Sequence, residues 1–106
     1  MGGEPREEIR LSNSPLDDIL ASRSHIRVLR VLALLGNDIN LTGRDIARRA
    51  GISRTRAQAV LVELVASSVV ARYPGATWAI YEINVDHPMA EGIPSLFKAE
   101  RQLTSA

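Results

Sequence analysis

Helical spacing of apolar residues dominates this chain, and a strand-like pattern interrupts it between residues 69 and 85. The first long helix is expected at 22–36, where Ser22 or Ser24 can cap the start and Gly36 can end it. Its apolar residues cover more than one stripe, which is typical of a helix that is buried on several sides. In so short a chain, this predicts that a second subunit covers one side of the helix.

The N-terminal residues divide into an aperiodic segment and a short helix. Residues 1–13 are polar and contain glycine, so we expect a flexible tail ahead of a single domain at 14–106. A short helix is expected to begin at Pro15, because proline suits the first helical position. Asp17 and Asp18 favour the same start through the helix dipole.

The stretch from residue 41 to residue 64 predicts two helices joined by a tight turn, preceded by a short extended piece at 39–41. Thr42 and Asp45 resemble a capping box at the start of the first helix, and Gly51 permits the positive φ of the turn. Ser53 caps the second helix, 54–66, in which Val62 and Val65 would either widen the core contact or join a partner surface. Four residues at helical spacing are expected to point to the core: Ala57, Val60, Leu61 and Leu64.

β-Branched and aromatic residues at 69–73 and 78–85 predict a β-hairpin with its turn at 74–77. If the tip lies at Ala76, Trp78 and Tyr81 fall on opposite faces of a strand, so one is expected to be buried and the other partly exposed. A last helix is expected to begin at Pro94. With Met89 and Ile93, it would present an apolar surface that needs cover: Leu96, Phe97 and Leu103.

Composition narrows the class of protein. The chain has 106 residues and no cysteine, which leaves no disulfide framework and no thiolate metal site. It has neither an 18-residue uncharged apolar run nor the apolar region of a secretory signal. Asp86, His87 and Glu91 are the nearest approach to a metal site of three or four ligands, but Asp86 with His87-Pro88 is better interpreted as a turn or the start of a helix. No set of catalytic residues stands out. The sequence therefore predicts a cytoplasmic protein that is not an enzyme, with no metal, no cofactor and no membrane contact.

Charge is unevenly placed along the chain. Residues 41–75 hold six arginines and two acids, Asp45 and Glu63, for a net charge of +4, whereas the whole chain carries +1. A basic middle with more acidic flanks predicts one cationic face and a polyanionic partner.

The order of elements, together with Thr42-Gly43-Arg44-Asp45-Ile46-Ala47 and Ala50-Gly51-Ile52-Ser53, resembles a winged helix-turn-helix domain. This resemblance implies a mainly α fold with a small β-hairpin. It is nearest to prokaryotic regulators of the arsenic-repressor-like and multiple-antibiotic-resistance-regulator-like kinds. The chain is also similar to winged-helix segments that precede minimal nucleotidyltransferase domains, although none of that enzyme's catalytic residues can be carried over.

The resemblance implies a transcriptional regulator that binds double-stranded DNA with helix 54–66 in the major groove, where the first residues of such a helix meet base edges. The residues expected to meet bases lie at the start of that helix: Arg54, Thr55, Arg56 and Gln58, with Ala59 near a thymine methyl group. Ser53, the cap of the helix, is a further expected DNA contact. Those expected to contact phosphates lie on the preceding helix: Thr42, Arg44, Arg48 and Arg49. Those nearest the tip of the hairpin are Arg72, Tyr73 and Thr77.

Two departures and two alternatives accompany this interpretation. The hairpin tip carries no Lys or Arg, and Ser67-Ser68 stands where such domains usually have a glycine. Either Ser68 adopts positive φ at a cost of ~1 kcal/mol, or the helix ends differently. The expected assembly is a homodimer with two recognition helices ~34 Å apart. The alternatives are a winged helix used as a protein-protein interaction module, and the regulatory segment of a nucleotidyltransferase-like enzyme.

Overall fold

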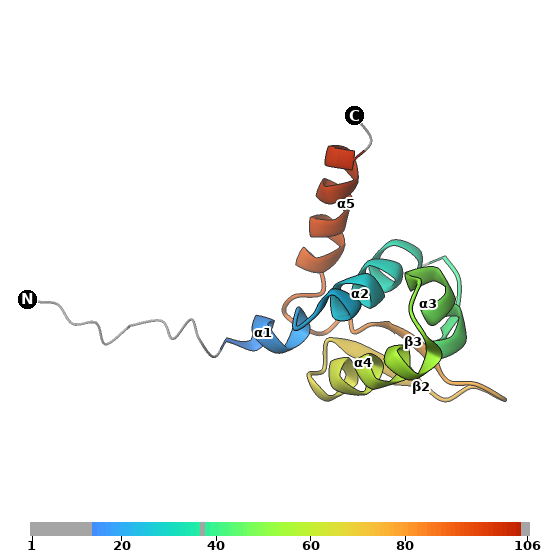
Figure 1. The fold of residues 1–106 in the computed structure, drawn as a ribbon. Helices are drawn as coiled ribbons and strands as arrows, with labels where there is room; N and C mark the ends of the chain where they lie inside the picture. Colours follow the sequence, from blue (N-terminus) through green and yellow to red (C-terminus); the bar gives the residue numbers. More distant parts are fainter. Residues whose placement is uncertain (1–13, 37, 105–106) are drawn as a thin grey trace, which may run out of the picture.

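The computed structural model describes residues 14–36 and 38–104, so the expected tail at 1–13 lies outside the described residues. Five helices and a three-stranded sheet follow in the order α1 (Pro15–Ile19), α2 (Arg23–Leu35), β1 (Leu41–Thr42), α3 (Gly43–Ala50), α4 (Arg54–Ala66), β2 (Val70–Tyr73), β3 (Ile80–Ile83) and α5 (Gly92–Thr104). In Figure 1, α2 runs through the middle of the molecule, α3 and α4 lie on one side of it, and α5 stands away on the other.

The sheet joins the predicted hairpin to the short extended piece. Strand order is β1-β3-β2, and both pairings are antiparallel. Leu41 pairs with Tyr81, and Val70 pairs with Ile83, so β3 lies between the other two strands. The extended piece begins at Leu41 and not at residue 39, and each strand of the hairpin is shorter than its apolar pattern.

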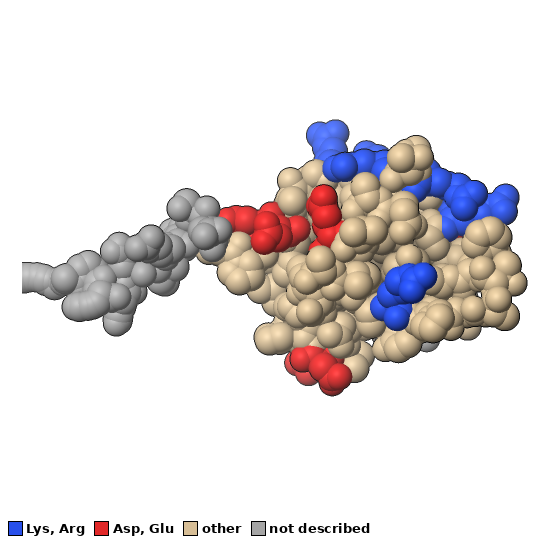
Figure 2. Space-filling view, turned by 90° about the horizontal axis from the view of Figure 1, so that it is seen from below, with Lys and Arg blue, Asp and Glu red and all other residues tan. Residues whose placement is uncertain are grey.

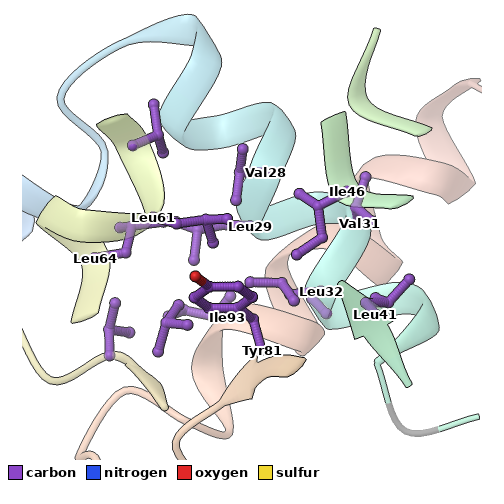
Figure 3. Packing of buried hydrophobic residues seen from close by; sticks show 14 of the residues in the cluster. Val28, Leu29, Val31, Leu32, Leu41, Ile46, Leu61, Leu64, Tyr81 and Ile93 are labelled. Atoms are coloured by element: carbon purple, nitrogen blue, oxygen red, sulfur yellow. The ribbon is translucent and has the colours of Figure 1, made fainter. Parts of the chain in front are cut away.

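The core is built from aliphatic residues of every layer (Figure 3). Leu29 of α2, Ile46 of α3 and Leu61 of α4 are fully buried, and Tyr81 reaches from β3 into the middle of the cluster. The four residues that the sequence assigned to the core face of the 54–66 helix are all buried. Trp78 is 56% exposed while Tyr81 is 5% exposed, which confirms the expected division of these two rings.

Helix α2 receives most of its cover from within the chain. It packs against α3, α4, α5 and β3, and its fully or largely buried residues point in several directions. The apolar surface left open lies instead on α5, where Leu96 is 56% and Leu103 82% exposed. This face of α5 is the surface that the sequence predicted to need cover, and Ile26 of α2 borders the hollow beside it.

Helix α5 begins at Gly92, so the predicted start at Pro94 was wrong by two residues. A proline in the first turn is tolerated because the N–H groups of that turn have no carbonyl partner within the helix. Arg30 of α2 holds α5 in place: its Nε and Nη2 donate to the two carboxylate oxygens of Glu100, each at 2.8 Å. Its guanidinium carbon also lies 5.4 Å from the centroid of the Phe97 ring.

Two residues between α4 and β2 take opposite backbone conformations. Ser67 is right-handed, with φ −82°, whereas Ser68 has φ 70°. The sequence-based expectation of positive φ at Ser68 is confirmed. Its carbonyl accepts a 2.8 Å hydrogen bond from Nδ2 of Asn84, which holds the strained residue against the end of β3.

We expect Ser68→Gly to raise the free energy of unfolding by up to about 1 kcal/mol, because glycine relieves the left-handed strain but loses more backbone entropy on folding. The neighbouring Ser67→Gly is the matched control and should lower it by roughly 0.5–1 kcal/mol. Urea unfolding of both variants measures the difference. Equal losses in the two variants would contradict a strained Ser68.

Candidate nucleic-acid interface

The turn between α3 and α4 sets the direction of α4. Gly51 has φ 72°, and its N–H reaches back to the carbonyl of Arg48 at 3.3 Å, which closes α3. Ser53 then caps α4, since its Oγ accepts the N–H of Arg56 at 3.0 Å. The chain thus leaves α3 and enters α4 within three residues, which is the helix-turn-helix arrangement that the sequence predicted.

The capping box of α3 engages the one acidic residue of that helix. Asp45 Oδ2 accepts hydrogen bonds from the N–H and the hydroxyl of Thr42, at 3.3 and 3.0 Å. The same two bonds, and then Arg48 and Arg49, hold the pKa of Asp45 below its ordinary value. Both hydrogen-bond donors of Thr42, its N–H and its hydroxyl, are therefore committed to Asp45, so that the expected phosphate contact would require one of these bonds to break.

Three arginines of α3 are exposed: Arg44, Arg48 and Arg49. Arg48 donates from Nη2 to Asp45 at 3.3 Å, a surface pair of small energetic value. Figure 2 shows the face on which α4 lies, with basic side chains forming a band along one margin. Acidic side chains lie beside α1 and on the opposite margin, and most of the face between the margins is uncharged, with one further basic group within it.

The exposed surface of α4 is polar at its start and mainly apolar beyond its first turn. Arg54, Thr55, Arg56 and Gln58 are exposed, as the sequence predicted, and so are Ala59 and Val62. Val65 packs against the core, so the two valines that the sequence left open divide between core and surface.

Two polar residues of α4 lie on opposite sides of its exposed surface. Gln58 lies beside the start of α3, because a Cβ added at Gly43 would stand 3.6 Å from its Oε1. Arg56 turns to the opposite side and donates from Nη2 to the hydroxyl of Ser22, the cap of α2, at 3.0 Å.

A buried histidine joins α2 to α4, and sequence reasoning missed it. His25 is 3% exposed; its Nε2 lies 2.6 Å from Oε1 of Glu63, and its Nδ1 lies 2.7 Å from Oγ of Ser22. Ser22 Oγ also accepts the backbone N–H of His25 and Nη2 of Arg56. With both lone pairs used, the hydroxyl donates to Nδ1, and the Nε2–H donates to Glu63.

This His25 network has an electrostatic consequence for the surface. Glu63 is the one carboxylate of α4, and its hydrogen bond draws it to the α2 side of the helix. The rest of the exposed surface of α4 then carries arginine or neutral side chains. Only a polar residue at position 25 hints at this network, because the two partners are 38 positions apart in the sequence.

The hairpin carries the remaining predicted residues. Arg72, Tyr73 and Thr77 are all exposed, at or beside the tip that projects from the body in Figure 1. Gly75 is required at this turn, since a Cβ there would lie 2.2 Å from the carbonyl oxygen of Trp78. Tyr73 and Trp78, which are 50% and 56% exposed, therefore give the tip an aromatic surface.

The described residues contain no group of three or more His, Cys, Asp or Glu side chains that could hold a metal ion. His87 instead accepts the N–H of Met89 on its Nδ1 at 3.0 Å, within the turn that precedes α5. Among the same residues, no helix has the length and apolar character needed to cross a membrane.

Comparison with known proteins agrees with this arrangement. Residues 22–77, more than half of the chain, match the profile of the MarR family. MepR from Staphylococcus aureus, described as a transcription regulator of the multidrug efflux pump MepA, is 22% identical with a TM-score of 0.62, over 85% of this chain and 68% of that chain.

A second solved structure comes from Mycobacterium bovis. It is a homodimeric winged helix-turn-helix DNA-binding domain, described as a possible ArsR-family transcriptional regulator. It is 21% identical with a TM-score of 0.60, over 98% of this chain and 89% of that chain. No curated protein sequence matches the chain. These likenesses confirm the winged helix-turn-helix fold.

We expect Glu63→Ala to lower the free energy of unfolding by about 1 kcal/mol, because it leaves the buried Nε2–H of His25 without its protein acceptor. Glu63→Gln keeps an acceptor oxygen at the same place and should recover at least half of the loss. Denaturant unfolding of both variants tests the hydrogen bond. Equal destabilisation by the two changes would show that it contributes nothing.

Proposed function

Because this chain belongs to the MarR family, we propose that it is a transcriptional regulator that binds double-stranded DNA, with α4 in the major groove. The observation that carries the proposal is the surface of α4: it is free of unpaired acid and bordered by the exposed arginines of α3. The proposal gives the chain a binding role and no reaction, and a cytoplasmic location remains our expectation.

The division of roles follows from position. Arg54, Thr55 and Gln58 begin α4 and are assigned to base edges, where arginine suits guanine and glutamine suits adenine. Arg44, Arg48 and Arg49 are assigned to phosphates, which position a domain without reading sequence. Arg56 is assigned to the edge of the DNA major groove that would lie next to α2, since its side chain turns to that side and donates to Ser22. Arg72, Tyr73 and Thr77 would contact the adjacent backbone or minor groove.

We propose that the regulator is a homodimer joined through α5. Two apolar hollows flank that helix, and Leu20, Leu96 and Phe97 line both of them. Leu103 extends the first hollow, and Met89 extends the second. A second copy is favoured as the cover because the Mycobacterium bovis domain of the same fold is a homodimer. Paired α4 helices would then meet two half-sites ~34 Å apart.

Fluorescence anisotropy with a random-sequence duplex, titrated at several salt concentrations, tests DNA binding. We expect micromolar binding with a steep negative slope of log affinity against log salt. Arg48→Ala should weaken all duplexes alike and reduce the slope by about one. Arg54→Ala should instead reduce discrimination among sequences by ~1–3 kcal/mol. Absence of binding at low salt by a folded protein would favour the protein-interaction alternative.

The dimer is tested with Leu96→Asp, which places a carboxylate on the open face of α5. We expect it to weaken self-association at least tenfold, because burying the charge costs more than ~1.4 kcal/mol. Sedimentation equilibrium measures the change, and Val85→Asp, at an exposed apolar residue that lines neither hollow, is the control. A wild-type protein that is monomeric at micromolar concentration would contradict the dimer and leave the DNA proposal standing.

A further inference from the structure

The most outward side chains of α4 form an uncharged stripe. Thr55, Ala59, Val62 and Ala66 follow at intervals of four, three and four residues, which places them on one line along the helix. All four are exposed, and Val62 is 60% exposed. The outward face of a surface helix is ordinarily polar. Three apolar side chains in line therefore indicate that this face contacts an apolar group of a partner.

We propose that this outward stripe reads the C5-methyl groups of thymines, so that the DNA site carries thymine opposite the middle of α4. The inference rests on the DNA-binding role proposed above and names the base that the helix selects. Among the groups that the four base pairs display in the major groove, the thymine methyl is the apolar one, and small apolar side chains pair with it.

The dimensions of the stripe suit several base pairs. From Thr55 to Val62 the helix rises by ~10 Å, and successive base pairs rise by ~3.4 Å, so this part of the stripe spans about three steps. Its alanines and single valine are short, which lets the helix approach the groove floor closely. The hydroxyl of Thr55 adds a polar group at the N-terminal end of the stripe, the end of α4 that meets the base edges.

The surroundings favour DNA over a protein partner as the occupant. Exposed arginines border the stripe, with Arg54 on α4 itself and Arg44 and Arg48 on α3. Glu63, which would repel phosphates, is drawn aside by His25. The basic band along one margin of this face in Figure 2 suits a phosphate backbone that runs beside the uncharged floor of the groove.

The test replaces thymine by uracil, which removes the methyl group and keeps base pairing and the O4 acceptor. A duplex is first selected from a random pool with the full chain, and we expect thymines in the centre of each half-site. Their replacement by uracil should weaken binding about fourfold for each contacted methyl group, the size expected for one buried methylene. Val62→Ala should weaken binding to the thymine duplex several-fold and shrink the difference between thymine and uracil.

Val85→Ala is the matched control, because Val85 is also exposed, at 77%, and lies beyond β3. It should leave both affinities unchanged. Equal binding of thymine and uracil duplexes by the wild-type protein, or equal losses on both duplexes in Val62→Ala, would overturn the inference while DNA binding stands. A wild-type protein that binds no duplex would overturn the proposed function itself.

Discussion

Burial of α2 is the constraint on which the other elements depend. Four elements that follow it in the sequence pack against this helix, and Val28 and Leu29 are inaccessible to solvent. Because α4 must place Leu61 and Leu64 against that core, its opposite side is forced outward. Packing of the buried side of α4 thus decides which side of the helix can meet DNA. The exposed positions do not contact the core, so they can carry residues that suit DNA recognition.

Local features of the fold could be predicted from the sequence, since each depends on a few consecutive residues. The caps at Thr42 and Ser53, the left-handed Gly51 and the strained Ser68 belong to this class. The start of α5 was missed because a proline fits any position of a first turn. The pairing of β1 with β3 joins residues about forty positions apart, and an apolar pattern does not encode such a register.

The exposed residues of the candidate site could likewise be predicted from helical periodicity, but their directions could not. Arg56 and Gln58 are two positions apart, yet one turns to α2 and the other to α3. The commitment of Thr42 to Asp45 and of Glu63 to His25 arises from side-chain geometry. In both cases a carboxylate is held by a hydrogen bond within the chain, which fixes where its negative charge lies beside the exposed arginines.

The projection of α5 from the body couples folding to assembly. The helix has 13 residues, and it buries chiefly Ile93 and Phe97 within its own chain. Helices shorter than ~12–15 residues are marginal in water without tertiary packing. A partner that covers Leu96 and Leu103 therefore supplies part of the free energy that orders α5 itself. The thermal midpoint of the protein then rises with its concentration, and the cellular amount of the chain helps to decide how much of it is completely folded.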